Sequence, residues 1–163
     1  MKGKKILVVE DQSGPLENIS LAIREAIFKE NLEKRFTDTP EEDLKERGVD
    51  VARCYDEALE AVGDKEYDLV FLDHRLPYEN QTELEASDFD EFCKCLDNIG
   101  YGLIPTIKDR SKKTVVIGTS SCDAYELRRF GQPDYVLKKI DWDISEKLEG
   151  ILEDIERRKE DDI

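Results

Sequence analysis

The chain lacks any apolar stretch long enough to span a membrane, and it has little positive charge for its size. It holds 25 lysines and arginines against 40 aspartates and glutamates, which gives a net charge of −15. This charge argues against binding to nucleic acid or to an anionic membrane, since both are themselves negative. The start of the chain runs into a strand too short to be the apolar region of a signal peptide, so we expect a cytoplasmic protein.

Cysteines are few and do not have the spacing of a metal site. The four cysteines are Cys54, Cys93, Cys95 and Cys122, and no two of them form a CxxC pair. Cys93 and Cys95 lie two apart in a helical pattern, so their side chains should point in different directions. We therefore expect reduced thiols rather than zinc ligands or a disulfide framework. The sequence also shows no repeat, linker or low-complexity segment.

Short apolar runs alternate with helical patterns along the whole chain. The runs predict strands at about 4–9, 49–54, 68–73, 114–119 and 134–138. Helices are predicted at about 14–36, 39–48, 56–65, 88–100, 123–130 and 143–160, and 101–113 is predicted to be irregular. Strands that alternate with helices indicate an α/β fold, a parallel sheet with right-handed crossovers and helices on both faces. The length of 163 residues suits one domain over 1–163.

Polar residues at the ends of these strands are the clearest functional signal. Glu10 and Asp11 end the first run, and Asp73 ends the third. Because ligands bind at the carboxyl edge of such sheets, three carboxylates should gather there. They repel one another unless a cation or a shared proton relieves them, and oxygen ligands of this kind suit Mg2+. Two further strand ends add a hydroxyl, Thr119, and a lysine, Lys138.

Four phrases in this order, each at a strand end, resemble the receiver domain of two-component response regulators. They are Lys5-Ile6-Leu7-Val8-Val9-Glu10-Asp11, Asp68-Leu69-Val70-Phe71-Leu72-Asp73 with Leu76-Pro77, Val116-Ile117-Gly118-Thr119-Ser120, and Gly131 to Lys138. The resemblance covers all five predicted strands. It implies a doubly wound, flavodoxin-like or CheY-like three-layer sandwich with strand order 2-1-3-4-5. Compared with the usual receiver, this chain has an extra helical segment at about 37–48 and a longer segment at about 78–113.

The resemblance also implies an acceptor and a metal site. Asp73 matches the phosphate acceptor, and a carboxylate can attack phosphorus to form an aspartyl phosphate. The reaction brings an anion towards other anions, so it needs a metal ion, Mg2+ or Mn2+, to neutralise charge. Its ligands would be Asp11, Glu10 directly or through water, Asp73, and the backbone carbonyl of Arg75.

Three further residues match positions that respond to the phosphoryl group. Thr119 would donate its hydroxyl to a phosphoryl oxygen, and Lys138 would reach the same oxygens as a point charge. Tyr135 matches the switch aromatic that turns inward on activation. The alternatives are a capping threonine, a solvated lysine and a half-buried strand tyrosine. His74, the single histidine, is expected to be structural or solvent-facing rather than a phosphorelay residue or a general base.

The function implied is that of a stand-alone receiver. It would take a phosphoryl group from a histidine kinase or phosphotransfer protein and signal through a downstream protein partner. Self-dephosphorylation is the one enzymatic step this would involve, and whether the chain counts as an enzyme stays open. The sequence does not identify the kinase, the partner or the oligomeric state.

Two alternatives stand beside this function. One is a receiver-like interaction module that works without phosphorylation. It is favoured by Lys139 in the place of the family's proline and by the absence of glycine from 78 to 90. The other is a phosphohydrolase of the haloacid-dehalogenase type, which is disfavoured because Arg75 stands where the second aspartate is needed.

Overall fold

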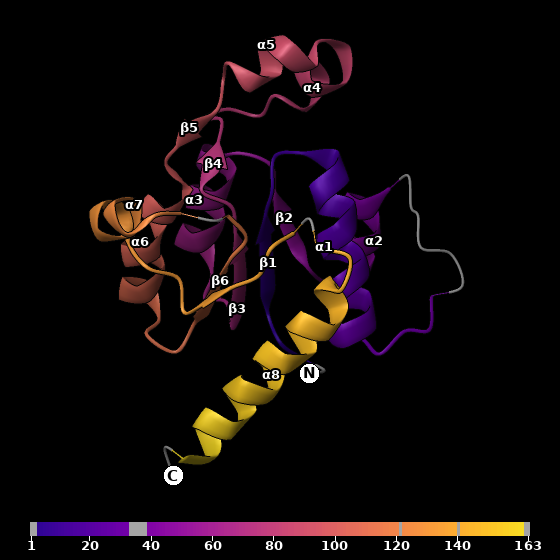
Figure 1. The fold of residues 1–163 in the computed structure, drawn as a ribbon, viewed down its shortest axis with the longest axis vertical. Helices are drawn as coiled ribbons and strands as arrows, with labels where there is room; N and C mark the ends of the chain where they lie inside the picture. Colours follow the sequence, from indigo (N-terminus) through magenta and orange to yellow (C-terminus); the bar gives the residue numbers. More distant parts are fainter. Residues whose placement is uncertain (1–2, 33–38, 121, 140, 162–163) are drawn as a thin grey trace.

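The computed structural model describes residues 3–32, 39–120, 122–139 and 141–161. In this part of the chain one parallel five-stranded sheet has the order β2-β1-β3-β6-β7 (Figure 1). Its strands are β1 (Ile6–Val9), β2 (Asp50–Ala52), β3 (Leu69–Leu72), β6 (Val115–Gly118) and β7 (Tyr135–Val136). Counted along the main sheet alone, this is the order 2-1-3-4-5. The predicted doubly wound fold and its strand order are therefore confirmed.

The sheet is buried because helices cover both of its faces. One face packs on α1 (Ser13–Ala26), α2 (Pro40–Glu46) and α8 (Ile144–Asp161). The other packs on α3 (Tyr55–Asp64), the 3-10 turn η1 (Gly100–Leu103), α6 (Ile104–Arg110) and α7 (Ala124–Phe130). Successive residues of β1 alternate between the two apolar clusters, as the pleat of a strand requires. No helix in the described segments is both long and apolar enough to cross a membrane.

The first helix is shorter than predicted. Leu16, Ile19 and Ile23 are buried at the expected helical spacing, but α1 ends at Ala26 instead of continuing towards residue 36. Lys29 has a φ of 57°, a left-handed conformation that an α-helix does not contain. Residues 33–36 of the predicted helix lie outside the described residues. The extra helical segment predicted at about 37–48 contains α2, although its residues 37 and 38 also lie outside the described range.

The segment between β3 and β6 departs most from the prediction. The helix predicted at 88–100 is shortened to α5 (Phe89–Cys93), and an unpredicted helix, α4 (Thr82–Ser87), precedes it. Both extend beyond the sheet in Figure 1. Asp88 separates these two helices, because its backbone is not helical and its side chain caps α5. A small antiparallel ribbon of β4 (Arg75–Leu76) and β5 (Asp97–Asn98) forms the base of the insertion.

Residues 101–113 are also more regular than predicted. They contain most of η1 and the whole of α6, which buries Ile104 and Ile107 against the sheet. Pro105 does not interrupt α6, because it lies in the first turn, where a backbone N–H has no partner within the helix. The presence of a proline in an apparently aperiodic segment was therefore a misleading signal of irregular structure.

Candidate functional site

Three carboxylates meet at the carboxyl edge of the sheet. Glu10 and Asp11 follow β1, Asp73 follows β3, and each offers an oxygen within 4.8 Å of the others. They come together because β1 and β3 are neighbours whose last residues pair, Val9 with Leu72. None of the three is more than 1% exposed. The pairing of these two apolar strands therefore brings three buried carboxylates together.

The buried acids have strongly altered proton affinities. Burial raises the pKa of Glu10, and the charge of Asp73 adds to the shift. Burial together with Glu10 and Asp73 raises the pKa of Asp11 to about 10. Neither carboxylate oxygen of Asp11 has a hydrogen-bond partner among the described residues. A buried polar group left in this state costs roughly 1–3 kcal/mol, so the site fits a hard divalent cation that would supply the missing partner.

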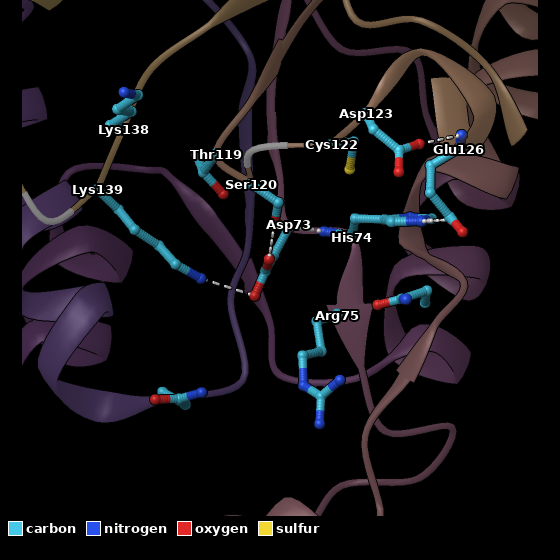
Figure 2. Close-up of a pocket in the computed structure, with 12 residues that line it drawn as sticks. Asp73, His74, Arg75, Thr119, Ser120, Cys122, Asp123, Glu126, Lys138 and Lys139 are labelled. Carbon is cyan, nitrogen blue, oxygen red and sulfur yellow. Dashed lines mark hydrogen bonds and ion pairs between the residues drawn. The ribbon is translucent and has the colours of Figure 1, made fainter. Parts of the chain in front are cut away.

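Lys139 is the cation that lies closest to this cluster in the described structure. Its Nζ is 2.8 Å from Asp73 Oδ2 and 2.7 Å from Glu10 Oε1 (Figure 2). Burial alone would lower the pKa of Lys139, but Asp73 and Glu10 outweigh it and raise the pKa. The backbone carbonyl of Lys139 accepts a hydrogen bond from Asn18 Nδ2 on α1, at 3.1 Å, which fixes the residue at the pocket.

The predicted lysine, Lys138, takes a different position. It lines the same pocket, but its side chain is exposed and lies away from Asp73 in Figure 2. Side chains alternate along and just beyond β7: Val136 and Lys138 are exposed, whereas Leu137 between them is buried. The residue that reaches the carboxylates is therefore one position later than the match to the receiver motif indicated.

The other oxygen of Asp73 is held by a hydroxyl that the sequence analysis did not single out. Ser120 Oγ donates a hydrogen bond to Asp73 Oδ1 and accepts one from the backbone N–H of His74 at 3.0 Å. Tyr101 in η1 secures this serine, since its hydroxyl donates to the backbone carbonyl of Ser120 at 2.7 Å. No sequence pattern indicated this contact, because Tyr101 comes from a segment that was expected to be irregular.

His74 is buried and structural in the described geometry. Its Nδ1 accepts from the backbone N–H of Tyr101 at 3.0 Å, so its Nε2 carries the proton that faces Glu126 Oε2 at 3.2 Å. The imidazole stacks on Tyr101 with ring centres 4.6 Å apart. His74 thus connects the strand that ends in Asp73 to α7, as Figure 2 shows.

Two of the three remaining predicted residues line the same pocket, which has a volume of about 590 Å3. Thr119 lines it, and its buried hydroxyl has no hydrogen-bond partner among the described residues. Arg75 lines the opposite wall with an exposed side chain. Tyr135 is half-buried and points away from the pocket, because its hydroxyl donates to Asp154 Oδ2 on α8 at 2.5 Å.

The structure is similar to solved receiver domains. It superposes on a CheY-like receiver domain from Methanospirillum hungatei with a TM-score of 0.53 and 15% identity, covering 97% of this chain and 98% of that one. The beryllofluoride-activated receiver domain of DrrB gives 0.54 and 21%, with 94% and 97% covered. The N-terminal domain of an uncharacterized protein from Wolinella succinogenes gives 0.58 and 21%, with 99% and 100% covered.

These comparisons establish the fold. The chain has the architecture of CheY-like response regulator receiver domains over most of its length. No protein-family model matches the sequence, and a search of curated proteins gives no match either. At such identities a common fold does not carry a common activity, so the function has to be argued from the site itself.

Proposed function

We propose that this protein is a receiver that accepts a phosphoryl group on Asp73 and signals through contacts with another protein. One observation carries the proposal: Asp11, whose two buried oxygens have no partner among the described residues, lies beside Asp73, whose oxygens are held by Lys139 and Ser120. A buried acid that lacks a partner and lies beside other acids is costly, and a structural role gives no reason for it. A cation followed by a phosphoryl group would use every one of these polar atoms.

The residues divide into a metal-holding set and a phosphoryl-binding set. Glu10, Asp11, Asp73 and the backbone carbonyl of Arg75 would hold Mg2+ or Mn2+, since they are all oxygen donors. When bound, the ion would neutralise charge on the phosphoryl oxygens as they approach these acids. The proposed ligand set contains no thiol. Cys122 is the one cysteine that lines the pocket as described.

In the chemical step the carboxylate of Asp73 would be the nucleophile. One of its oxygens forms the bond to phosphorus while the bond from phosphorus to the donor's leaving group breaks. Lys139 is placed to pair with a phosphoryl oxygen, because its ammonium group already pairs with the carboxylate of Asp73. Thr119 offers a hydroxyl that has no competing partner in the described part of the chain. Tyr135 would be free to respond only after it leaves Asp154.

The resemblance to receiver domains supplies a donor and a recipient for this chemistry. We propose a histidine kinase or a phosphotransfer protein as the donor, and a downstream protein partner as the recipient of the signal. The insertion between β3 and β6 changes the surface around the pocket, so neither partner can be inferred from other receivers. The second candidate, an interaction module that works without phosphorylation, becomes the better account if Asp73 accepts no phosphoryl group.

The proposal is tested by intact mass after incubation with acetyl phosphate and Mg2+. The wild type should gain one phosphoryl group that hydroxylamine removes, and Asp73→Asn should gain none. Asp123→Asn is a matched control, because Asp123 lines the same pocket and asparagine can replace it as the cap of α7. A folded wild type that binds Mg2+ yet never gains the mass would refute phosphoryl acceptance.

A further inference from the structure

A buried arginine holds the turn that carries Glu10 and Asp11. Arg53 follows β2 and is 7% exposed. Its Nε donates to the backbone carbonyl of Glu10 at 2.9 Å, and its Nη2 donates to the backbone carbonyl of Asp11 at 3.1 Å. A guanidinium is planar and its donors have fixed directions. These two bonds therefore fix the backbone from which both acidic side chains project.

The same guanidinium contacts the insertion. Arg53 Nη2 lies 3.7 Å from Glu85 Oε1 on α4 and donates to Ser13 Oγ at 3.1 Å. Glu85 in turn accepts two hydrogen bonds from Ser13, one from the backbone N–H at 3.0 Å and one from the hydroxyl at 2.9 Å. The three residues form a closed network directly behind the acidic turn.

This network supplies what the first turn of α1 lacks. The Gln12 side chain makes no capping hydrogen bond, and the first turn of this helix, all of it described, contains no acidic residue. Helix N-termini are stabilised by a nearby carboxylate. Glu85 provides one from 72 positions away in the sequence. The start of α1, which immediately follows the metal-binding turn, therefore depends on the insertion.

A second contact keeps the insertion in this position. Glu57 on α3 accepts from the backbone N–H of Arg53 at 2.9 Å and from Asn80 Nδ2 at 2.7 Å. Asn80 also accepts from the backbone N–H of Thr82 at 3.0 Å, where α4 begins. The helix that presents Glu85 is thus attached to the same loop that presents Arg53.

We infer that Glu85 and Arg53 are positioning residues for the candidate metal ligands, so that the insertion helps to set the affinity of the site for a divalent cation. The inference rests on the proposed function, because it requires Glu10 and Asp11 to hold the ion. Binding to a turn that is already ordered avoids the cost of ordering it on binding. Partners that orient metal ligands typically change metal affinity by about 10–100-fold when they are removed.

A graded set of variants tests this inference by Mg2+ titration calorimetry and by the Mn2+ electron paramagnetic resonance signal. Glu85→Ala removes the contacts of this side chain with Arg53 and Ser13, so it should raise the Kd for Mg2+ roughly tenfold or more. Glu85→Gln keeps one oxygen acceptor for Ser13 and should lie between the wild type and Glu85→Ala. Glu83→Ala is the matched control, since Glu83 is exposed on the same helix, and its Kd should equal that of the wild type.

Variants of Arg53 give a second test of the inference. Arg53→Lys keeps the charge but cannot make both directed bonds, so it should weaken metal binding as Glu85→Ala does. Combined, the two changes should weaken binding by less than the product of their separate effects, because they act through one network. Two outcomes overturn the inference and can be told apart. An unchanged Kd in Glu85→Ala overturns it alone, whereas a wild type that binds no ion overturns the proposed metal site as well.

Hydrogen exchange of the metal-free protein distinguishes positioning from general stability. Glu85→Ala should lose protection at the Ser13 amide, whose partner it removes, while the amides of β3 stay protected. A merely structural contact would lower the unfolding temperature and leave Kd unchanged. Metal affinity restored in part by Glu85→Gln is the expected signature of a positioning role.

Discussion

Lys139 Nζ lies 2.8 Å from Asp73 Oδ2 and 2.7 Å from Glu10 Oε1, so one lysine bridges two of the three buried acids. The raised pKa of Lys139 keeps it charged at neutral pH. In the metal-free pocket it is therefore the charge that offsets the acids. A metal ion and Lys139 would compete for the same oxygens, and a phosphoryl group would give the lysine a new partner.

This relationship predicts opposite effects on two ligands. Lys139→Met should bind Mg2+ more tightly, by roughly 1 kcal/mol or about fivefold, because a competing charge about 3 Å from the acids is gone. The same variant should lose the structural response to beryllofluoride, which needs the lysine. Lys138→Met should leave both nearly unchanged. Calorimetry and hydrogen exchange over residues 115–139 would check this, and a larger effect from Lys138 would restore the assignment made from the motif.

Asp11 should affect stability and metal binding in opposite directions. Asp11→Asn removes a carboxyl that burial and its neighbours disfavour in the charged form, so the metal-free variant should be at least as stable as the wild type at pH 7. Mg2+ at ten times its Kd should stabilise the wild type by about 1.4 kcal/mol and should not stabilise the variant. Urea unfolding with and without Mg2+ measures both.

The control for that experiment is Asp90→Asn, an exposed acid in the insertion. It should keep the full response to Mg2+. If Asp11→Asn were stabilised by Mg2+ as strongly as the wild type, the ion would be bound elsewhere on this acidic chain.

Much of the fold was predictable because a few short-range signals determine it. Buried parallel strands are continuous apolar runs, and those of β1 and β3 end in the acids that mark the edge of the sheet. The insertion was not predictable in the same way. Asp88 begins α5 as the predicted helix requires, but α5 ends at Cys93, and Gly100, the end of the predicted helix, packs against the backbone carbonyl of Asp73. Such close approaches depend on residues distant in the sequence.

The site was predictable in composition and less so in detail. Acids at strand ends meet wherever their strands pair, so Glu10, Asp11 and Asp73 required only the strand order. The choice between Lys138 and Lys139 depends on which way a side chain turns after the short strand β7, and a motif match does not determine that. Ser120 reaches Asp73 only because Tyr101 secures it from η1.

Glu30 connects the extra helical segment to α1 and gives a prediction about pH. Arg47 donates to it through Nε at 2.5 Å and through Nη2 at 2.7 Å. This pairing, helped by Arg24, lowers the pKa of Glu30 below its ordinary value of 4.5. A lowered folded pKa stabilises the protein above about pH 4.5, and that contribution is lost as the pH falls through the folded pKa.

Glu30→Gln should therefore cost about 1 kcal/mol in the free energy of unfolding at pH 7, because the pair is partly exposed. At acid pH, below the folded pKa of Glu30, the variant and the wild type should be equally stable. Urea unfolding at the two pH values is the measurement. Glu42→Gln, an exposed change on α2, should have little effect at either pH. An equal loss at both pH values would mean that packing, and not charge, connects these helices.

Thr119 and Ser120 should separate the phosphoryl-bound state from the free state. Thr119→Ala removes a buried hydroxyl that has no partner among the described residues, so the free protein should lose little stability. Its affinity for beryllofluoride should fall roughly tenfold, about 1.4 kcal/mol, because only the phosphoryl analogue uses that hydroxyl.

Ser120→Ala should show the reverse pattern. It removes the donor to Asp73 and the acceptor for the backbone N–H of His74, which should destabilise the free protein by about 1.5–3 kcal/mol. Its affinity for beryllofluoride should change less than that of Thr119→Ala, because in the free protein Ser120 already occupies the oxygen of Asp73. Urea unfolding and calorimetric titration with beryllofluoride, performed on both variants, give the four values needed. If Ser120→Ala lost the analogue while Thr119→Ala kept it, Ser120 would be the hydroxyl that binds the phosphoryl group. That hydroxyl, like the lysine nearest to Asp73, would then lie one residue after the position that matches the receiver motif.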